Sequence, residues 1–162
     1  MLHDHVIPKP ESWKAYTSHQ LLEGLTKGAR PMFVDNGGHL LVRSADPSLT
    51  QSSKPLRTVN VGDVLGFELR ASCGVKVKGK HRYFPLKDWR ARRAWLERRA
   101  SGFEVLSVTV SARSVNIKQN IRIDQSDFSG VLRVTDVAAL NQILENGIGG
   151  PGRAFGHGML VI

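Results

Sequence analysis

Cysteine is nearly absent from the sequence, with Cys73 alone among 162 residues. One cysteine excludes a disulfide within the chain, and this low usage is typical of a reducing cytoplasm. No apolar run approaches the roughly 20 residues of a membrane-spanning helix, and no lysine-rich amphipathic helix indicates anchoring at a membrane surface. The first residues also lack the basic and then apolar order of a secretory signal. We therefore expect a cytoplasmic protein without membrane contact.

Residue groups for metal or nucleotide chemistry are missing as well. No close cluster of Asp and Glu predicts a Mg²⁺ site, and no GxxxxGK[ST] motif predicts a nucleotide pocket. His3 and His5 share one face of a predicted strand, but no third and fourth ligands follow at suitable spacing, which favours a structural or surface role. The sequence therefore predicts neither a bound metal nor a small-molecule cofactor.

Acidic side chains are few beside basic ones, 14 against 23, and the net charge is +9 at pH 7. This surplus favours a polyanionic partner, with nucleic acid first and an anionic membrane surface second. Aromatic residues make up only 7% of the chain. Binding of a folded RNA by its backbone and shape is therefore favoured over stacking on many single-stranded bases.

Periodicity and turn signals divide the chain into two similar halves. In the first half they predict a helix from Ser12 to about Leu25, a hairpin turn at residues 36–38, a polar loop over 46–54, and strands over 1–7, 31–35, 39–45 and 64–72. In the second half they predict a basic extended segment over 76–86, a helix over 88–100, a hairpin turn at 113–116, a helix capped by Thr135 or Asp136, and strands over 103–112, 117–123, 128–134 and 159–162.

Each half reads approximately as strand, helix, strand, strand, helix, strand, except that the second helix is missing from the first half. This order predicts an α+β fold of two tandem ferredoxin-like (βαββαβ) domains, the first one shortened. We expect the first domain to span residues 1–72 and the second to span residues 73–162. The basic segments and the glycine-rich run described next belong to the second domain.

A glycine-dense run over residues 147–158 connects the last predicted helix to the last predicted strand. Its six glycines lose more backbone entropy on folding than a simple connector needs to lose. A backbone this bare can lie against a bulky partner, with its N–H groups directed at phosphate oxygens. A flexible turn is the alternative. The residues predicted to contact nucleic acid here are Gly149, Gly150, Gly152 and Arg153.

Basic side chains recur in the two segments before this run. In the extended segment they fall on almost every second residue, which predicts one positively charged face, at Lys76, Lys78, Lys80 and Arg82. In the predicted hairpin they are Arg113, Lys118 and Arg122. Any one of them is also explained as solvated surface. Together they indicate a track for phosphates, with arginines able to reach guanine edges.

The first predicted helix places Tyr16 and His19 three residues apart, in a row beside its apolar stripe. Histidine is the side chain best suited to proton transfer at neutral pH. Metal-free RNA cleavage requires attack of a 2′-hydroxyl on the adjacent phosphorus, a proton-transfer group and a cation for the charged phosphorane. The alternative for His19 is a boundary histidine that bonds to Glu23 or to the backbone.

Several motifs together resemble the CasE-like CRISPR repeat endoribonucleases, the guide RNA maturation enzymes of type I-E systems within the glycine-rich-loop RAMP superfamily. The clearest are FSGVLRVTD at residues 128–136, the helix that follows, GIG at 147–149 and AFGHGML at 154–160. Weaker similarities are AYTSHQ at 15–20, GFELRA at 66–71 and AWLERR at 94–99. The resemblance covers nearly the whole chain.

This resemblance implies two ferredoxin-like domains and a hairpin that enters the major groove beside a repeat stem-loop. It implies metal-independent cleavage at the 3′ side of the stem, which leaves a 2′,3′-cyclic phosphate and a 5′-hydroxyl. Carried over by position, His19 is the catalytic histidine, Tyr16 its partner at the scissile nucleotide and Lys118 the supporting cation. The implied partners are the repeat RNA and other subunits of a type I-E-like interference complex in a prokaryotic cytoplasm.

The sequence departs from the family pattern in three places. The first half is short, residues 72–74 read Ser-Cys-Gly where the family has Asn-Pro, and His157 stands where relatives often have cysteine. These differences point to a variant system or to a repeat with a different stem. Two other hypotheses stay open, a non-catalytic RNA-binding subunit of a CRISPR ribonucleoprotein and a basic DNA-binding domain.

Overall fold

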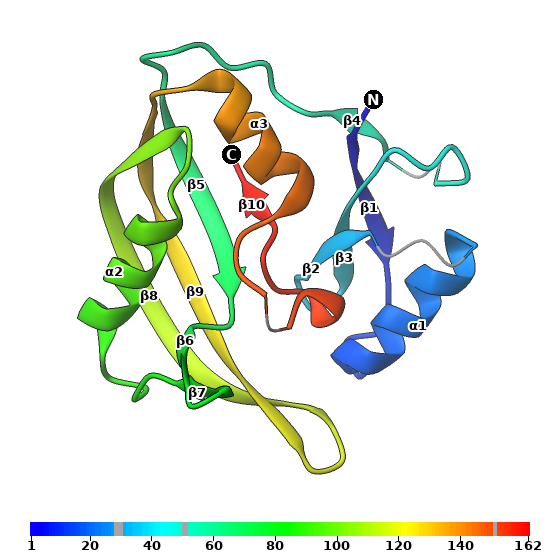
Figure 1. Ribbon diagram of the computed structural model, residues 1–162. Helices are drawn as coiled ribbons and strands as arrows, with labels where there is room; N and C mark the ends of the chain where they lie inside the picture. The colour runs from blue at the N-terminus through cyan, green and yellow to red at the C-terminus, as the bar shows by residue number, and fades with distance from the viewer. Residues whose placement is uncertain (28–30, 50–51, 151) are drawn as a thin grey trace.

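The computed structural model describes residues 1–27, 31–49, 52–150 and 152–162, which form two four-stranded antiparallel sheets with helices packed on them (Figure 1). The first part of the chain contains β1 (His3–Pro8), α1 (Ala15–Leu25), β2 (Met32–Asp35), β3 (His39–Ser44) and β4 (Lys54–Pro55). The second part contains β5 (Val64–Ala71), β6 (Gly74–Val77), β7 (Lys80–Tyr83), α2 (Trp89–Arg99), β8 (Phe103–Lys118), β9 (Ile121–Val134), α3 (Val137–Asn146), the short 3₁₀ helix η1 (Arg153–Phe155) and β10 (Leu160–Val161). None of the described helices is long and apolar enough to cross a membrane.

The first sheet has the strand order β2-β3-β1-β4. Helix α1 buries Leu22 in a small core against the sheet, together with Ile7, Phe33, Leu40, Val42 and Leu49. Between β3 and β4 the described residues contain no helix. This sheet therefore has the ferredoxin-like strand order without the second helix, as the sequence predicts.

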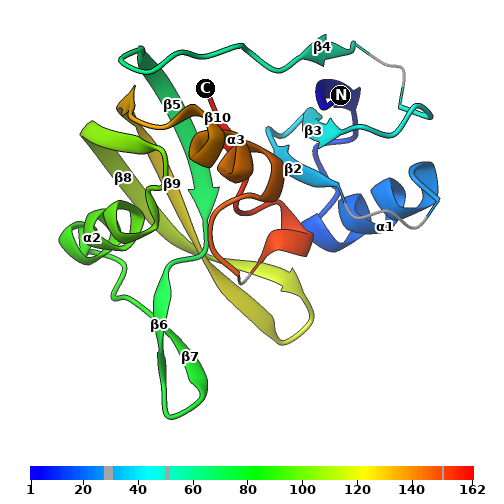
Figure 2. The ribbon, with the colours of Figure 1, turned by 45° about the horizontal axis from the view of Figure 1, so that its top comes forward.

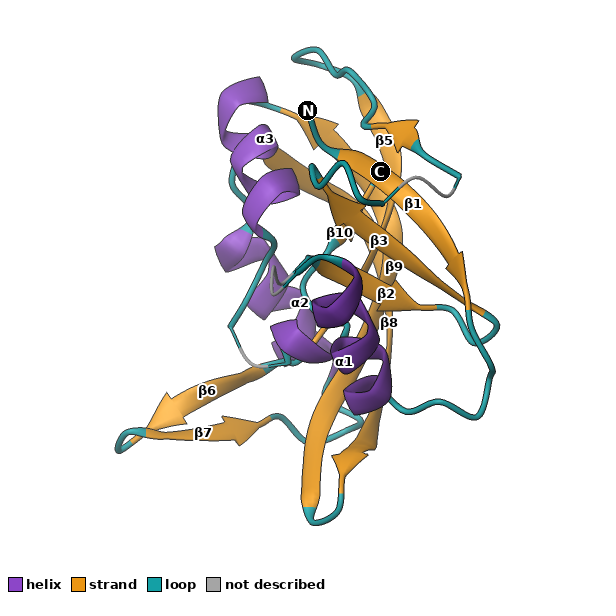
Figure 3. Ribbon diagram, turned by 90° about the vertical axis from the view of Figure 1, so that its right-hand side faces the viewer, coloured by secondary structure: helices purple, strands orange, loops and turns teal. Residues whose placement is uncertain are grey.

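The second sheet has the equivalent order β10-β5-β9-β8, and its elements follow one another as β5, α2, β8, β9, α3 and β10. Both helices lie on the same side of the sheet (Figure 3). They bury Trp95 and Leu140 against the alternating inward residues Leu65, Phe67 and Leu69 of β5. This is a complete βαββαβ unit, and the predicted α+β fold with two ferredoxin-like units is confirmed.

Strand β5 belongs to the second unit, because it pairs with β9 along its whole length and with β10 at Leu69 and Glu68. A division after residue 72 separates this strand from both of its partners. We propose instead that the two units divide between β4 and β5, within residues 56–63.

The predicted hairpin turn at residues 113–116 is wrong. β8 continues to Lys118 and turns only at Gln119 and Asn120, where Asn120 has a positive φ of 64°. Ile117 and Ile123 are buried near the far end of this hairpin. Val115 pairs with Ile123 and Val110 with Phe128, and strand alternation therefore puts Ile123 on the face opposite to Phe128. The ladder thus continues past the polar residues that suggested a turn, with buried apolar residues on its second face.

The N-cap predicted at Ser12 is also wrong. The N–H of Trp13 donates to the carbonyl of Pro10 at 3.2 Å, which closes a turn, and Lys14 occupies the N-cap position without a side-chain bond. At α3 the cap is Asp136, whose carboxylate accepts from the N–H of Ala139 at 3.0 Å. Of the polar loop over 46–54, residues 50–51 lie outside the described part of the chain.

The basic extended segment folds into a separate two-stranded hairpin, β6–β7, with a tight turn at Lys78 and Gly79. Both turn residues have positive φ, 50° and 75°. Lys76 pairs across the hairpin with His81, whereas Lys80 and Arg82 pair with valines. Because directly paired residues share a face, Lys76 lies on one face and Lys80 and Arg82 on the other. The prediction of one uniformly basic face is therefore wrong.

Arg43 of β3 ties the two units together. Its side chain is buried, pairs with Asp4 at 2.8 and 2.9 Å, and donates to the carbonyls of Leu144 at 3.1 Å and Leu160 at 2.7 Å. A second link comes from Arg70 of β5, which donates to the carbonyl of Asp35 at 2.7 Å. These contacts set the position of α1 relative to the segment between α3 and β10.

Candidate functional site

Helix α1 lies against the glycine-rich segment that precedes β10 (Figures 1 and 2). The His19 side chain is 16% exposed, and its Nε2 lies 3.5 Å from Oε1 of Glu23, one helical turn further along. The His19 ring also meets the ring of Phe155 edge to face, with centroids 5.8 Å apart. One imidazole therefore stands at the junction of the first unit and the glycine-rich segment, with part of its surface open.

Tyr16 and Lys118 meet beside this histidine. The Nζ of Lys118 lies 5.2 Å from the centroid of the Tyr16 ring, a cation–π distance. Lys118 is the last residue of β8, so the long hairpin extends from the second unit to α1. The structure thus brings Lys118 to Tyr16, which lies one helical turn before His19 on α1.

The glycine-rich segment follows a path that larger residues would obstruct. Gly149 has a φ of +83°, and a Cβ there would lie 3.0 Å from the ring of Trp95. Gly156 has a φ of +89° and would place a Cβ 3.0 Å from the ring of Phe33. The segment therefore packs against an aromatic ring of each unit, and it carries Phe155 to His19 between these two contacts.

The other predicted residues of this segment differ in their surroundings. A Cβ on Gly150 would meet nothing within 4 Å, whereas Gly152 has a left-handed conformation beside His157 and Ile123. Arg153 is exposed and donates to the carbonyl of Asn146, at the end of α3. Its guanidinium thus has a structural partner within the chain. Pro151 lies outside the described residues.

A cleft of about 600 Å³ extends from α1 to the long hairpin. Positive charge enters it from three elements, at Lys14, Arg70 and Arg113. Arg113 is held by Gln125, whose amide oxygen, in the orientation that satisfies both groups, accepts from Nη2 and Nε at 3.0 and 3.1 Å. Phe155 lines the same cleft, which therefore adjoins His19. The cleft is lined by three cationic side chains and one acidic one, Asp35, and Arg70 among the cations also pairs with Asp127 at 2.8 Å.

His157 lines this cleft as well, but it is only 3% exposed. Burial, followed by the charge of Arg70, lowers the pKa of His157 from 6.5 to about 4. Its Nδ1 lies 3.2 Å from the carbonyl oxygen of Phe155, to which an N–H at that position donates. His157 is therefore neutral near pH 7 and supports the backbone of the segment.

The remaining predicted basic residues do not gather at His19. Arg122 is exposed on β9 and donates to Oγ of Ser114 at 3.2 Å. Lys76, Lys78, Lys80 and Arg82 are exposed on β6–β7. This hairpin and the far end of β8–β9 project from the same end of the molecule, away from the two termini (Figures 1 and 3). The basic residues thus form an extended surface beside the His19 region.

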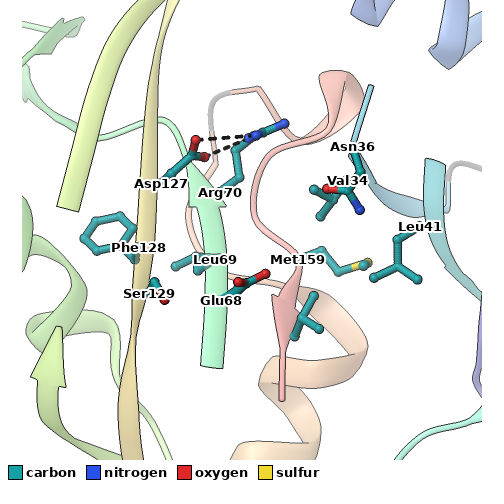
Figure 4. A pocket seen from close by; sticks show the side chains of 11 residues that line it. Val34, Asn36, Leu41, Glu68, Leu69, Arg70, Asp127, Phe128, Ser129 and Met159 are labelled. Carbon is teal, nitrogen blue, oxygen red and sulfur yellow. Dashed lines mark hydrogen bonds and ion pairs between the residues drawn. The ribbon is translucent and has the colours of Figure 1, made fainter. Parts of the chain in front are cut away.

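Figure 4 shows a different pocket, of about 260 Å³, between the two sheets. Val34 and Leu41 line it from the first sheet, and Leu69 and Phe128 from the second. None of the residues predicted from the sequence to form a site lines this pocket. In the described part of the chain, no three His, Cys, Asp or Glu side chains are grouped as metal ligands. The candidate site is therefore the region of His19 and the adjoining cleft.

Sequence reasoning missed several residues of this region. Lys14 and Gln125 have no motif of their own, and Arg70 lies in the GFELRA motif without any sign of a site; they meet at the cleft only because three distant segments come together there. Phe155 had a signal, since it is the one aromatic residue within the glycine-rich run. A single large ring among small residues indicates that this ring packs against another part of the protein, and here it packs against His19.

A family model described as CRISPR associated protein matches residues 11–162. No curated protein matches the chain significantly. Among solved structures, Cse3 of Thermus thermophilus bound to an RNA representing a pre-cleavage complex is similar at 22% identity, with a TM-score of 0.82 over 99% of this chain and 97% of that chain. The CRISPR-associated protein Cas6e from Escherichia coli K-12 is 26% identical, with a TM-score of 0.79 over 99% of this chain and 98% of that chain. A chain of E. coli Cascade bound to a PAM-containing dsDNA target is 25% identical, with a TM-score of 0.65 over 99% of this chain and 96% of that chain.

Proposed function

The chain belongs to the CRISPR-associated protein family, and on this premise we propose that it is a metal-independent endoribonuclease that binds the stem-loop of CRISPR repeat RNA and cleaves at the 3′ side of the stem. The observation that carries the proposal is the convergence of His19, Tyr16 and Lys118 beside the glycine-rich segment. A partly exposed imidazole, on the same helix as a tyrosine that contacts a lysine and beside a cationic cleft, has the parts that RNA transesterification requires.

In the proposed reaction the ribose 2′-oxygen attacks the adjacent phosphorus, and the bond to the 5′-oxygen of the next nucleotide breaks. His19 transfers the proton, either from the 2′-hydroxyl or to the leaving 5′-oxygen. Lys118 stabilises the added negative charge of the phosphorane, and Tyr16 orients the scissile nucleotide. The products are a 2′,3′-cyclic phosphate and a 5′-hydroxyl. All of these steps use side chains of this protein.

The surfaces around His19 fit an RNA backbone. Lys14, Arg70 and Arg113 place positive charge in the adjoining cleft. The exposed residues of β6–β7 and Arg122 extend this charge along one end of the molecule. Of the glycine-rich segment, Gly149, Gly150, Gly152 and Arg153 belong to the proposed RNA surface. Contacts of this kind give an affinity that falls steeply with salt.

The proposed partners are the repeat RNA and other subunits of a type I-E-like interference complex, in the cytoplasm of a prokaryote. Two of the similar structures support this part of the proposal. Cse3 was solved with an RNA representing a pre-cleavage complex, and another similar chain is part of E. coli Cascade.

The test is cleavage of the organism's own repeat RNA by the purified protein in EDTA. We expect the wild type to cut once at the 3′ side of the stem, and His19→Ala to lose cutting by at least 100-fold, the usual scale of an acid–base group. RNA affinity should change little in His19→Ala. His39→Ala, in β3 and outside the site, is the matched control and should cut like the wild type.

Other outcomes identify the alternatives. Tight binding with intact RNA in EDTA identifies a non-catalytic RNA-binding subunit, for which the contact of His19 with Glu23 provides a structural role. Duplex DNA that competes as well as the RNA hairpin identifies a DNA-binding domain. Loss of folding in His19→Ala assigns the imidazole to the core.

A further inference from the structure

A second basic hollow lies on the opposite side of the glycine-rich segment from His19, where that segment meets β6–β7 and the end of α2. We call it the α2 pocket. Its volume is about 420 Å³, and it is lined by Gly74 and Lys76 of β6, His81 of β7, Arg98 and Arg99 of α2, and Gly150. Among the described residues that line it, none is acidic.

The walls of the α2 pocket are held by contacts with two buried side chains, Trp95 and Arg92. Arg99 lies over the ring of Trp95, 4.3 Å from its centroid, and Gly149 packs against the same ring. Arg92 is fully buried and donates to the carbonyl of Phe84 at 3.1 Å, which fixes the connection between β7 and α2. The hairpin, the helix and the glycine-rich segment therefore have defined positions around the hollow.

The cationic side chains of the α2 pocket lie close enough to repel one another. In the part of the chain that the structure describes, no acidic side chain forms an ion pair with Lys76, Arg98 or Arg99. Burial, and then the charge of Arg98, lowers the pKa of Arg99. Burial, and then Lys76 and Arg99, lowers the pKa of His81. An anion in this hollow would relieve the repulsion between three fixed cations.

We propose that the α2 pocket binds a phosphodiester group of the RNA strand that passes the glycine-rich segment. This inference rests on the proposed function. The segment runs from Gly150 at the α2 pocket to Phe155 at His19. A strand that lies along it contacts the pocket and the cleavage site at once. Arg98 is a substrate-positioning residue in this arrangement, because it holds the RNA at a phosphate other than the one that reacts.

The test compares Arg98→Ala with Arg90→Ala, which removes the same charge from the exposed start of α2, outside the pocket. Affinity for the organism's repeat RNA is measured against salt concentration. Loss of one phosphate contact reduces the slope of log K against log salt by about 0.7 to 0.9, which is about five- to eightfold in affinity at 0.1 M salt. We expect this change in Arg98→Ala and an unchanged slope in Arg90→Ala.

A second measurement locates the phosphate. Repeat RNAs are prepared that each carry a single uncharged methylphosphonate linkage, with a 2′-deoxy sugar on its 5′ side. We expect one linkage, apart from the scissile one, to weaken binding to the wild type and to have no further effect on Arg98→Ala. Equal losses in both proteins at every linkage would overturn the proposal.

The outcomes also separate this inference from the proposed function. Normal cleavage with equal salt slopes in both variants rejects the α2 pocket and leaves the nuclease proposal intact. If Arg98→Ala reduces the salt slope of RNA affinity but the wild type does not cleave the RNA, the nuclease proposal is wrong and the α2 pocket proposal stands. If inorganic phosphate alone raises the melting temperature of the wild type but not of Arg98→Ala, and RNA affinity is equal in both, then the site takes free phosphate and the RNA assignment is wrong.

Discussion

His157 is a titratable residue that folding holds in its neutral form. Its pKa is about 4 in the folded protein against 6.5 for an ordinary histidine, because burial and Arg70 disfavour the charged ring. Between pH 6.5 and pH 4, the histidine binds a proton in the unfolded chain, whereas the buried ring of the folded protein stays neutral. Falling pH therefore favours unfolding from about pH 6.5 down to pH 4, and the loss amounts to about 3 kcal/mol at the lower end.

We predict that His157→Gln, which can still donate to the carbonyl of Phe155, removes this pH dependence. The free energy of unfolding is measured by chemical denaturation at intervals between pH 7 and pH 4. The wild type should lose up to about 3 kcal/mol more than the variant over this range. His39→Gln, a histidine that is not fully buried, is the control and should follow the wild type. Parallel curves for wild type and His157→Gln would contradict the prediction.

The sequence predicts how two side chains lie relative to each other when both belong to the same helix or strand. The spacing of Tyr16 and His19 places both on one side of α1, and they lie there. The contact of Lys118 with Tyr16 depends on where the end of β8 falls in space, which residue spacing along the chain does not specify. Tertiary placement likewise determines the burial of His157, since the same residue in an open loop would stay at its usual pKa.

Among the elements, the glycine-rich segment allows two neighbouring substitutions to be compared. Gly149 has positive φ and touches Trp95, whereas Gly150 has room for a side chain and no positive φ. We predict that Gly149→Ala destabilises the protein by more than about 1 kcal/mol, and that Gly150→Ala changes stability by less than about 0.5 kcal/mol. Thermal and chemical denaturation of both variants measures the difference.

RNA affinity then separates the two roles of this segment. A loss of affinity in Gly150→Ala, with stability unchanged, means that RNA approaches the backbone at Gly150. Equal stability of the two variants would show that the conformation of Gly149 is not required.

The sequence predicts a strand correctly where its alternation of apolar residues matches the residues that are buried, as at Leu65, Phe67 and Leu69 of β5. It fails where polar residues form part of a strand. Residues 113–116 look like a turn, yet Ser114 and Val115 pair with Asp124 and Ile123 in a continuous ladder. In a long hairpin, backbone hydrogen bonds on both sides of a polar stretch keep that stretch extended, whereas in a short hairpin the same residues would form the loop.

For the molecule as a whole, the stability of the two-unit arrangement depends on Arg43. Removal of this side chain leaves the carboxylate of Asp4 and the carbonyls of Leu144 and Leu160 without their buried donor. We predict that Arg43→Met lowers the free energy of unfolding by about 3–5 kcal/mol, the usual loss when one partner of a buried ion pair is removed. Chemical denaturation at pH 7 measures it.

Arg133→Met is the matched control, because Arg133 forms an exposed pair with Glu104. We expect a change of about 1 kcal/mol or less in this variant. Similar losses in the two variants would mean that the bonds of Arg43 between the units add no more than a surface pair.

The presence of two ferredoxin-like units was readable from the order of predicted strands and helices. The boundary between them was not, because β5 follows β4 in sequence and each half needs a final strand. Only the pairing of β5 with β9 and β10 assigns it to the second unit. The order of the predicted strands and helices fits the assignment of β5 to either unit equally well.

The contact between His19 and Phe155 joins segments that are far apart in the order of synthesis. A nascent chain therefore carries α1 without its aromatic partner until residue 155 has been synthesised. Under the proposed function, we expect the His19 region to become complete only after that point.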